Sequence, residues 1–114
     1  MNKEKPVVYI CSKYSGDIET NTKMARQYCR LAVDWGYVPI APHLLFPQFL
    51  DEETERDIAL SMDLKILERC DELWVCGNAF SEGMALEYME AGKRNMKTRV
   101  ITEEVLECLQ SAKE

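Results

Sequence analysis

The amino-acid sequence predicts a single α/β domain, a three-layer sandwich around a parallel, flavodoxin- or Rossmann-like sheet of four or five strands. Two observations lead to this fold class. Short apolar runs, typical of strands buried on both faces, alternate with helical patterns, an order that gives parallel strands with helices on both faces. The 114 residues fit one domain, residues 1–114, and their 46% hydrophobic content is enough for a core.

The first half of the chain is predicted to contain two strands joined by a helix. Pro6–Cys11 is a continuous apolar run rich in β-branched residues and is the first strand. A polar segment leads from it into a helix that Thr20 or Asn21 caps and that ends near Gly36. A second, shorter strand follows over Tyr37–Ile40, and its proline places it at an edge of the sheet.

The second half continues the alternation of helices and strands. In order, we expect an irregular connection over Ala41–Asp51, a helix over Glu52–Arg69, a strand over Asp71–Cys76, a loop over Gly77–Glu82, a helix over Gly83–Arg94, a strand over Thr98–Ile101 and a closing helix over Thr102–Ala112. Strand one should be central, flanked by strands two and three through right-handed crossovers. Ligands of such sheets bind beyond the carboxyl ends of the strands, so the loops there are the candidate site.

Composition and charge narrow the classes of partner. The formal charge of −6 and the lack of a basic run disfavour nucleic acid, whose phosphates need clustered Lys and Arg. The amino terminus has too short an apolar run for a signal peptide, and no stretch approaches the roughly 20 apolar residues of a membrane helix. We therefore expect a cytoplasmic protein that binds no membrane.

Cysteine and histidine usage predicts neither a metal site nor a cofactor. The five cysteines are odd in number and lack the spacing of a zinc site, so we interpret them as reduced core residues. His43 is the only histidine, and it has no partners that could complete a metal site. It follows the second strand, where it either stacks on or hydrogen-bonds a base or has a structural role.

The segment Ser81–Gly92 (SEGMALEYMEAG) carries the strongest candidate for chemistry. Its predicted sheet-facing stripe comprises Met84, Tyr88 and Ala91. Glu87 points the same way, so a carboxylate lies on an apolar face near the start of a helix. Ser81 is suited to cap that helix, and Gly83 lets a ligand approach its first turn. The alternative is that Glu87 is a surface carboxylate at the edge of the stripe, or is paired with a basic side chain.

Asp63 is a second carboxylate on an apolar face. The predicted arc that contains it comprises Ile58, Ala59, Met62, Ile66 and Leu67. Burying a lone carboxylate is costly, so Asp63 either faces a polar cavity or makes a structural hydrogen bond. Leu60 and Leu64 widen the arc, and they are either core residues or part of a subunit interface.

Residues at the end of the first strand are further candidates. Tyr9 lies near the carboxyl end of that strand, where ligands bind, although buried strand tyrosines are commonly core residues. Ser12, Ser15 and Gly16 offer hydroxyl and amide groups to a phosphate or a sugar. They match neither the dinucleotide fingerprint nor the P-loop, so the pattern names no particular ligand.

Three segments of the chain resemble one superfamily of enzymes. Val8–Cys11 (VYIC), Met62–Val75 (MDLKILERCDELWV) and Ser81–Glu87 (SEGMALE) are similar to the nucleoside 2-deoxyribosyltransferase superfamily. Within it they look most like the 2′-deoxynucleoside 5′-phosphate N-hydrolase branch, and a bacterial and phage family, a domain of unknown function, resembles the whole chain still more closely. The most specific part is the S-x-G-x-x-x-E motif after a strand of the D-E-L-W-V type.

The resemblance implies roles for individual residues. It implies that Glu87 is the nucleophile that attacks the anomeric carbon of the sugar, and that Ser81 helps to hold the sugar or phosphate. It adds Asp63 and Tyr9 to the active site. The hydrolase branch has an arginine for the 5′-phosphate in the loop after the first strand, whereas this chain has Lys13, a point charge without the fork of Arg.

Three functional hypotheses follow from these residues and this resemblance. The first is an enzyme that cleaves the N-glycosidic bond of a nucleoside or nucleotide, by hydrolysis or transfer, through a Glu nucleophile. The second is a non-catalytic nucleotide-binding or sensing domain on the same fold. The third is a structural partner in a larger assembly. The resemblance also implies a homodimer or higher homo-oligomer, in which an adjacent subunit often completes the pocket.

Overall fold

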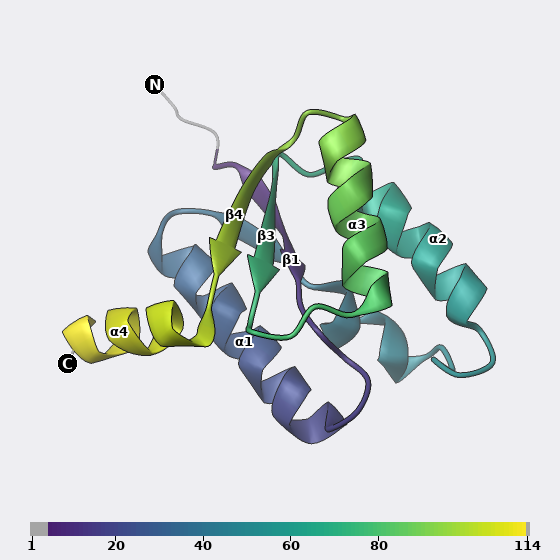
Figure 1. Cartoon of the computed structure of the whole chain (residues 1–114), viewed down its shortest axis with the longest axis horizontal. Coiled ribbons are helices and arrows are strands. Elements are labelled where there is room, and N and C mark those ends of the chain that lie inside the picture. The colour runs from purple at the N-terminus through teal and green to yellow at the C-terminus, as the bar shows by residue number, and fades with distance from the viewer. Residues whose placement is uncertain (1–4, 114) are drawn as a thin grey trace.

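The computed structural model describes residues 5–113 (Figure 1). Its elements are β1 (Val7–Cys11), α1 (Ile18–Asp34), β2 (Val38–Ile40), the short 3-10 turns η1 (Pro42–Leu44) and η2 (Phe46–Gln48), α2 (Arg56–Leu67), β3 (Glu72–Cys76), α3 (Glu82–Lys93), β4 (Lys97–Ile101) and α4 (Glu103–Lys113). The strands form one parallel sheet in the order β2-β1-β3-β4. The predicted fold class and the central position of the first strand are confirmed.

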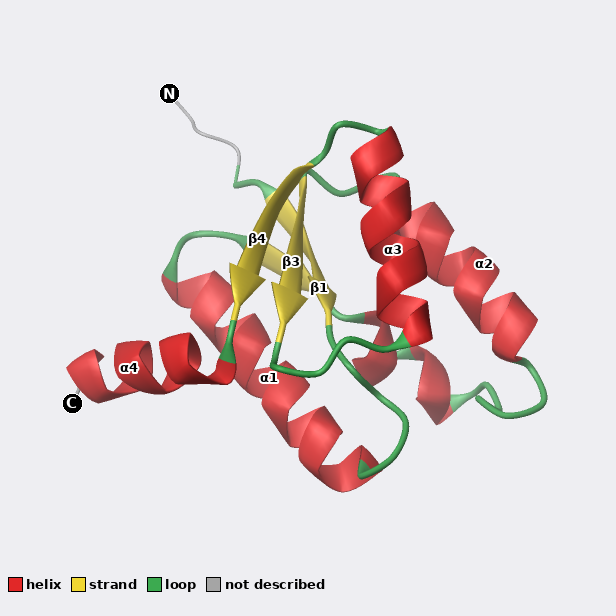
Figure 2. Cartoon of the chain, viewed as in Figure 1, coloured by secondary structure: helices red, strands yellow, loops and turns green. Residues whose placement is uncertain are grey.

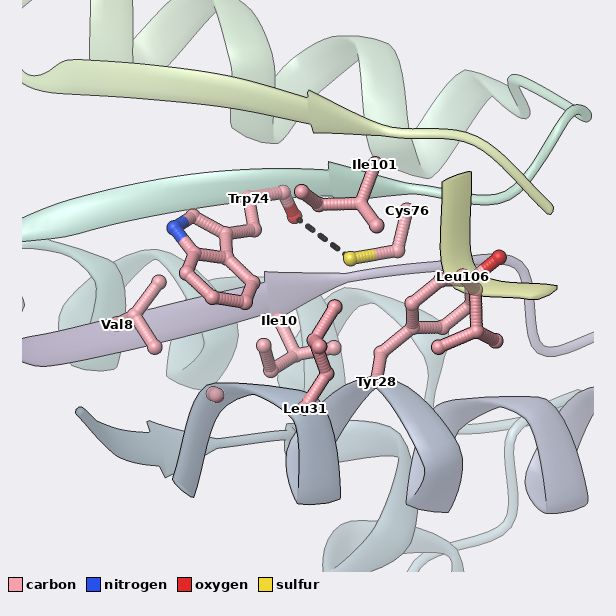
Figure 3. Packing of buried hydrophobic residues seen from close by; sticks show 9 residues of the cluster. Val8, Ile10, Tyr28, Leu31, Trp74, Cys76, Ile101 and Leu106 are labelled. Carbon is pink, nitrogen blue, oxygen red and sulfur yellow. Dashed lines mark hydrogen bonds between the residues drawn. The ribbon is translucent and has the colours of Figure 1, made fainter. Parts of the chain in front are cut away.

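Helices cover both faces of the sheet, α1 and α4 on one side and α2 and α3 on the other (Figure 2). The core on the α1 side contains Val8, Ile10, Tyr28, Leu31, Ala32, Trp74, Cys76, Ile101 and Leu106 (Figure 3). The core on the α3 side contains Tyr9, Cys11, Leu67, Cys70, Leu73, Val75, Met84 and Ala91. Successive residues of a strand point to opposite faces, so β1 sends Tyr9 and Cys11 towards α3 and their neighbours towards α1.

The ends of two helices differ from the prediction for local reasons. Helix α1 begins at Ile18 because Asp17 is its cap: the Thr20 backbone N–H donates to Asp17 Oδ1 at 3.2 Å. Helix α2 begins at Arg56, four residues later than predicted. A turn at Asp51 holds the preceding residues, since its Oδ1 accepts from the Glu53 backbone N–H at 2.9 Å.

The inward faces of α2 and α3 also differ from the predicted stripes. On α3 the buried residues are Met84, Glu87 and Ala91, whereas Tyr88 is 48% exposed. Tyr88 therefore lies beside the sheet-facing stripe rather than in it. On α2, Ile58 is 49% exposed, so its predicted place in the inward arc was wrong. Leu64 packs against the α3-side core, which is one of the two alternatives left open for it.

Composition predicted that the cysteines lie in the core and that no helix spans a membrane. All five cysteines are free, but Cys108 is exposed on α4 and is therefore not a core residue as predicted. The helix containing it faces the core through other positions, such as Leu106. Within residues 5–113, none of the helices is both long enough and apolar enough to span a bilayer.

Candidate active site

A short hydrogen bond joins β1 to α3. Tyr9 lies in the middle of β1, the second strand of the sheet order, and its side chain faces α3. Glu87 lies in the second turn of α3, on the buried side. The Tyr9 hydroxyl donates to Glu87 Oε2 at 2.6 Å. This length is typical of a hydrogen bond from a hydroxyl to a carboxylate.

The start of α3 is fixed by the cap that the sequence predicted. Ser81 Oγ accepts a hydrogen bond from the Met84 backbone N–H at 3.2 Å. The cap sets the rotation of the first turn and hence the direction in which Glu87 points one turn later. A Cβ added at Gly83 would lie 4.0 Å from Ser81 Oγ, an ordinary contact, so packing within the described chain does not require a glycine there.

Asp63 reaches the same place from α2. It is 6% exposed and Glu87 is 2% exposed, so both carboxyl groups are buried on the α3 side of the sheet. Burial raises the pKa of Asp63 to about 8, and the charge of Glu87 and then of Glu52 adds to the effect. Burial also raises the pKa of Glu87, while hydrogen bonds from Tyr9 and other neighbours act in the opposite direction.

Tyr9 and Cys11 surround these carboxyl groups with protonated donors. Burial, followed by the charges of Glu87 and Asp63, raises the pKa of Tyr9 well above its ordinary value. Burial and the charge of Glu87 likewise raise the pKa of the Cys11 thiol. Cys11 was not among the predicted site residues. The signal that could have found it is its spacing of two residues from Tyr9, which places both side chains on one face of β1.

Tyr9, Asp63 and Glu87 together form what we call the carboxylate cluster. Two like charges in a low-dielectric site cannot both ionise easily, so the Asp63–Glu87 pair retains one proton near neutral pH. The cluster thus places a carboxyl group held by a tyrosine beside a second carboxyl group whose raised pKa favours its protonated form. This is the pairing of nucleophile and acid that glycosidic bond cleavage requires.

The predicted binding residues after β1 separate into buried and exposed groups. Ser12 is buried at the end of the strand, whereas Lys13, Ser15 and Gly16 lie exposed in the loop. Gly16 has a φ of +98°, a left-handed conformation that favours glycine, and its carbonyl accepts from the Ile18 backbone N–H. Gly16 thereby turns the loop into α1.

His43 makes a ring contact at the same edge of the sheet. It stacks on Tyr14 with ring centroids 5.3 Å apart and an interplanar angle of 23°. Burial lowers the pKa of His43 to about 4, so the imidazole is neutral at pH 7. The stacked pair connects the loop after β1 to the loop after β2.

Two pockets open near the carboxyl ends of the strands. The larger, of about 480 Å³, has Phe80, Tyr88 and Val100 in its walls. The smaller, of about 50 Å³, is lined by Ser12 and Tyr28 among others. Neither of the two is lined by a member of the carboxylate cluster, which is enclosed between β1, α2 and α3. With Glu87 2% exposed and Asp63 6% exposed, the carboxylate cluster is almost entirely buried.

Fold and site together define a doubly wound parallel α/β domain with a buried carboxylate cluster between its central strand and a helix. The family described as Domain of unknown function (DUF7768) matches residues 6–101. The chain belongs to this family. No curated protein matches it.

A solved structure of the 2-deoxyribosyltransferase from the psychrotolerant bacterium Bacillus psychrosaccharolyticus has a similar fold. The two chains are 19% identical and superpose with a TM-score of 0.59, over 84% of this chain and 72% of the other. That enzyme is described as a suitable biocatalyst for the industrial synthesis of antiviral and antitumoral nucleosides. The similarity shows that the deoxyribosyltransferase fold predicted from the sequence is present here.

Proposed function

We propose that this domain cleaves the N-glycosidic bond of a nucleoside or nucleotide, with Glu87 as the nucleophile. The observation that carries the proposal is the carboxylate cluster, in which Tyr9 holds Glu87 at 2.6 Å and Asp63 shares its environment. The deoxyribosyltransferase-like fold and the S-x-G-x-x-x-E motif at Ser81–Glu87 support the same reaction.

The reaction proceeds in two displacements. One carboxylate oxygen of Glu87 forms a bond to the anomeric carbon, the C–N bond breaks, and its electron pair leaves with the base. Asp63 donates the proton that the departing base requires, because its raised pKa of about 8 keeps it protonated near neutrality. Water or a second base then bonds to the anomeric carbon, the ester bond to Glu87 breaks, and Asp63 takes up the proton that the attacking group loses. The same intermediate therefore serves hydrolysis and transfer.

A second function is favoured by the enclosure of the site. Glu87 is 2% exposed, so a substrate reaches it only after the elements around the cluster move. A domain that binds a nucleotide at the sheet edge without admitting it to Glu87 acts as a sensor. This chain has Lys13 in the loop where the hydrolase branch has a phosphate-binding arginine, and a lysine lacks the forked hydrogen-bonding geometry of arginine. This difference is compatible with a sensor.

Base release from a panel of nucleosides and 5′-monophosphates, followed by chromatography, tests the enzyme. Glu87→Gln keeps the size of the side chain but removes the nucleophile, so turnover should fall by about 1000-fold or more. Glu82→Gln is the matched control, since Glu82 is an exposed glutamate on the same helix and should retain activity. Full activity in Glu87→Gln would overturn the assignment of Glu87 as the nucleophile. Nucleotide binding without base release by the wild-type protein would favour the sensor.

A further inference from the structure

Cys11 is a buried thiol beside the carboxylate cluster, and the proposed reaction does not use it. It is the last residue of β1, it has no exposed surface, and it lies two residues after Tyr9 on the face that α3 covers. Burial, followed by the charge of Glu87, raises the pKa of the thiol, so it keeps its proton near neutral pH. A protonated, enclosed thiol is a poor nucleophile and acts as a hydrogen-bond donor instead.

The backbone offers Cys11 only a distant acceptor. Cys70, a second buried cysteine of the α3-side core, donates to the Ile66 carbonyl four residues earlier at 3.3 Å. The carbonyl that accepts from Cys11 is that of Met84, across the interface on α3, and it lies 3.9 Å from the sulfur. This separation is long even for a thiol donor, so the Met84 carbonyl holds the proton of Cys11 only weakly.

Glu87 is the second acceptor within reach of the Cys11 thiol. It lies on the same buried stripe of α3 as Met84. Burial raises the pKa of Glu87, and the hydrogen bonds that its carboxylate accepts from Tyr9 and then from Cys11 act against this effect. A hydrogen bond to an ionised acceptor is stronger than one to a neutral carbonyl. The thiol therefore has a strong acceptor while Glu87 is charged and a weak one, the Met84 carbonyl, while it is not.

The charge of Glu87 changes twice in the proposed reaction. Its carboxylate is ionised before the attack, is a neutral ester while it carries the sugar, and regains its charge as the ester bond breaks. A donor that favours the ionised form makes Glu87 a weaker nucleophile but a better leaving group. Low-dielectric surroundings strengthen such a hydrogen bond. The second displacement is thus the step that a thiol donor assists.

We propose that Cys11 is a positioning residue that speeds breakdown of the glycosyl-enzyme through its hydrogen bond to Glu87. The inference rests on the proposed function. As water bonds to the anomeric carbon, the electron pair of the breaking C–O bond returns to Glu87, and Asp63 takes up the proton that the water loses. The thiol transfers no proton. It turns from the Met84 carbonyl to the carboxylate, which Tyr9 holds from the other side.

Rapid-quench measurement of base release separates the two displacements, with a nucleoside or 5′-monophosphate that the wild-type protein cleaves. Cys11→Ala should release the first equivalent of base at least as fast as the wild type, but its steady-state turnover should fall by about tenfold. Mass spectrometry of the quenched protein should then show accumulated glycosyl-enzyme. Cys11→Ser keeps a donor of similar size and should restore most of the turnover. Cys70→Ala, which removes a buried thiol from the same core, is the control and should turn over like the wild type.

The infrared S–H stretch tests the hydrogen bond without turnover. Subtracting the spectrum of Cys11→Ala from that of the wild type identifies the Cys11 band. The frequency of this stretch rises as the acceptor weakens, so Glu87→Gln, which replaces a carboxylate by a neutral amide, should move the Cys11 band to higher frequency. The Cys70 band should stay in place, because its acceptor is the Ile66 carbonyl. Thermal unfolding checks that each variant is folded.

The outcomes separate this inference from the proposed function. If the wild type releases base, the proposed function stands. Unchanged turnover in Cys11→Ala, turnover that falls without accumulated glycosyl-enzyme, an equal defect in Cys11→Ser, or a Cys11 band that does not respond to Glu87→Gln would then each overturn the role of Cys11. If the wild type releases no base from any compound of the panel, the proposed function fails, and the role in ester breakdown fails with it. The band shift in Glu87→Gln then decides whether the thiol still positions the Glu87 carboxylate.

Discussion

Three carboxylates are buried within residues 5–113, and their surroundings differ. Glu72 accepts hydrogen bonds from Tyr37 at 2.8 Å and from Trp74 at 3.2 Å, and Lys97 and Arg99 each approach it at 3.8 Å. These cations balance the charge of Glu72, as is usual for a buried carboxylate with a structural role. Asp63 and Glu87 face one another and a tyrosine instead of cations. That difference is why we assign chemistry to the second group alone.

The proton held by the Asp63–Glu87 pair makes stability depend on pH. In the unfolded chain Asp63 returns to its ordinary pKa of 3.8, whereas the folded protein holds the proton until about pH 8. The folded state therefore binds more protons between these values, and stability should fall as the pH rises through them.

Urea unfolding at about pH 5 and about pH 8 measures this effect. The wild-type free energy of unfolding should be lower at the higher pH, by more than about 1 kcal/mol, since each unit of pKa shift corresponds to about 1.4 kcal/mol. Asp63→Asn should flatten the dependence. Asp57→Asn, an exposed aspartate on the same helix, should leave it as in the wild type. A pH-independent wild type would show that the pair is not protonated as described.

At the scale of an element, α3 determines where the proposed nucleophile, Glu87, lies. Its buried stripe is Met84, Glu87 and Ala91, so a carboxylate occupies a position that packing would otherwise give to an apolar residue. The helix is held at its start by Ser81 and beside α2 by Arg94, which pairs with Glu90 at 2.9 Å and reaches Glu68 at 3.4 Å. Exposed pairs of this kind contribute little, so the cap and the buried face stabilise the helix.

Removing the cap should therefore loosen α3. Ser81→Ala should lower the free energy of unfolding by about 1 kcal/mol, because the Met84 backbone N–H loses its acceptor. It should also lower turnover, because the orientation of Glu87 depends on that turn. Ser61→Ala, a mid-helix serine on α2, is the control and should change stability by less than about 0.5 kcal/mol. Chemical denaturation of both variants measures their free energies of unfolding. If Ser81→Ala is as stable as Ser61→Ala, the cap does not stabilise the protein.

At the scale of the whole molecule, one face remains uncovered. Strand β4 is an edge strand, and its Val100 is 62% exposed on the side of the sheet that α3 leaves open. Phe80 and Tyr88 stand beside it, with their rings 6.1 Å apart, in the walls of the pocket of about 480 Å³. All of the residues that line this pocket are uncharged, in a chain in which 30% of residues are charged. Charge-poor, aromatic surfaces of this kind are typical of the centre of an interface.

We therefore expect a homo-oligomer, most simply a two-fold dimer, that forms through β4 and α3 rather than through Leu64, which packs in the core. Sedimentation at micromolar concentration should show a species heavier than one chain. Val100→Lys, a charge on an edge strand, should shift it towards the monomer. Val33→Lys, at an exposed valine on α1, is the control and should leave the sedimentation unchanged. A monomeric wild type would contradict the prediction.

The sequence by itself determined the order of the elements, the parallel sheet and the candidate carboxylates. These follow from local patterns: a β-branched run such as Val7–Cys11 predicts a strand wherever it lies, and helical spacing places Glu87 on an apolar face. The predicted boundaries failed at Asp17 and at Arg56, where a single capping or turn hydrogen bond decides the first helical residue.

The family resemblance placed Tyr9, Asp63 and Glu87 in one site, but only the tertiary structure decided which of their atoms are in contact. The Tyr9–Glu87 hydrogen bond joins residues 78 positions apart, and no local pattern encodes such a distance. The same holds for the pocket between Ser12 and Tyr28, and for the exposure of Tyr88, which depends on how α3 is rotated against the sheet. Periodicity tells which side of an element is apolar, but the packing of whole elements sets which side chains become neighbours, and burial among those neighbours sets their pKa values and their chemistry.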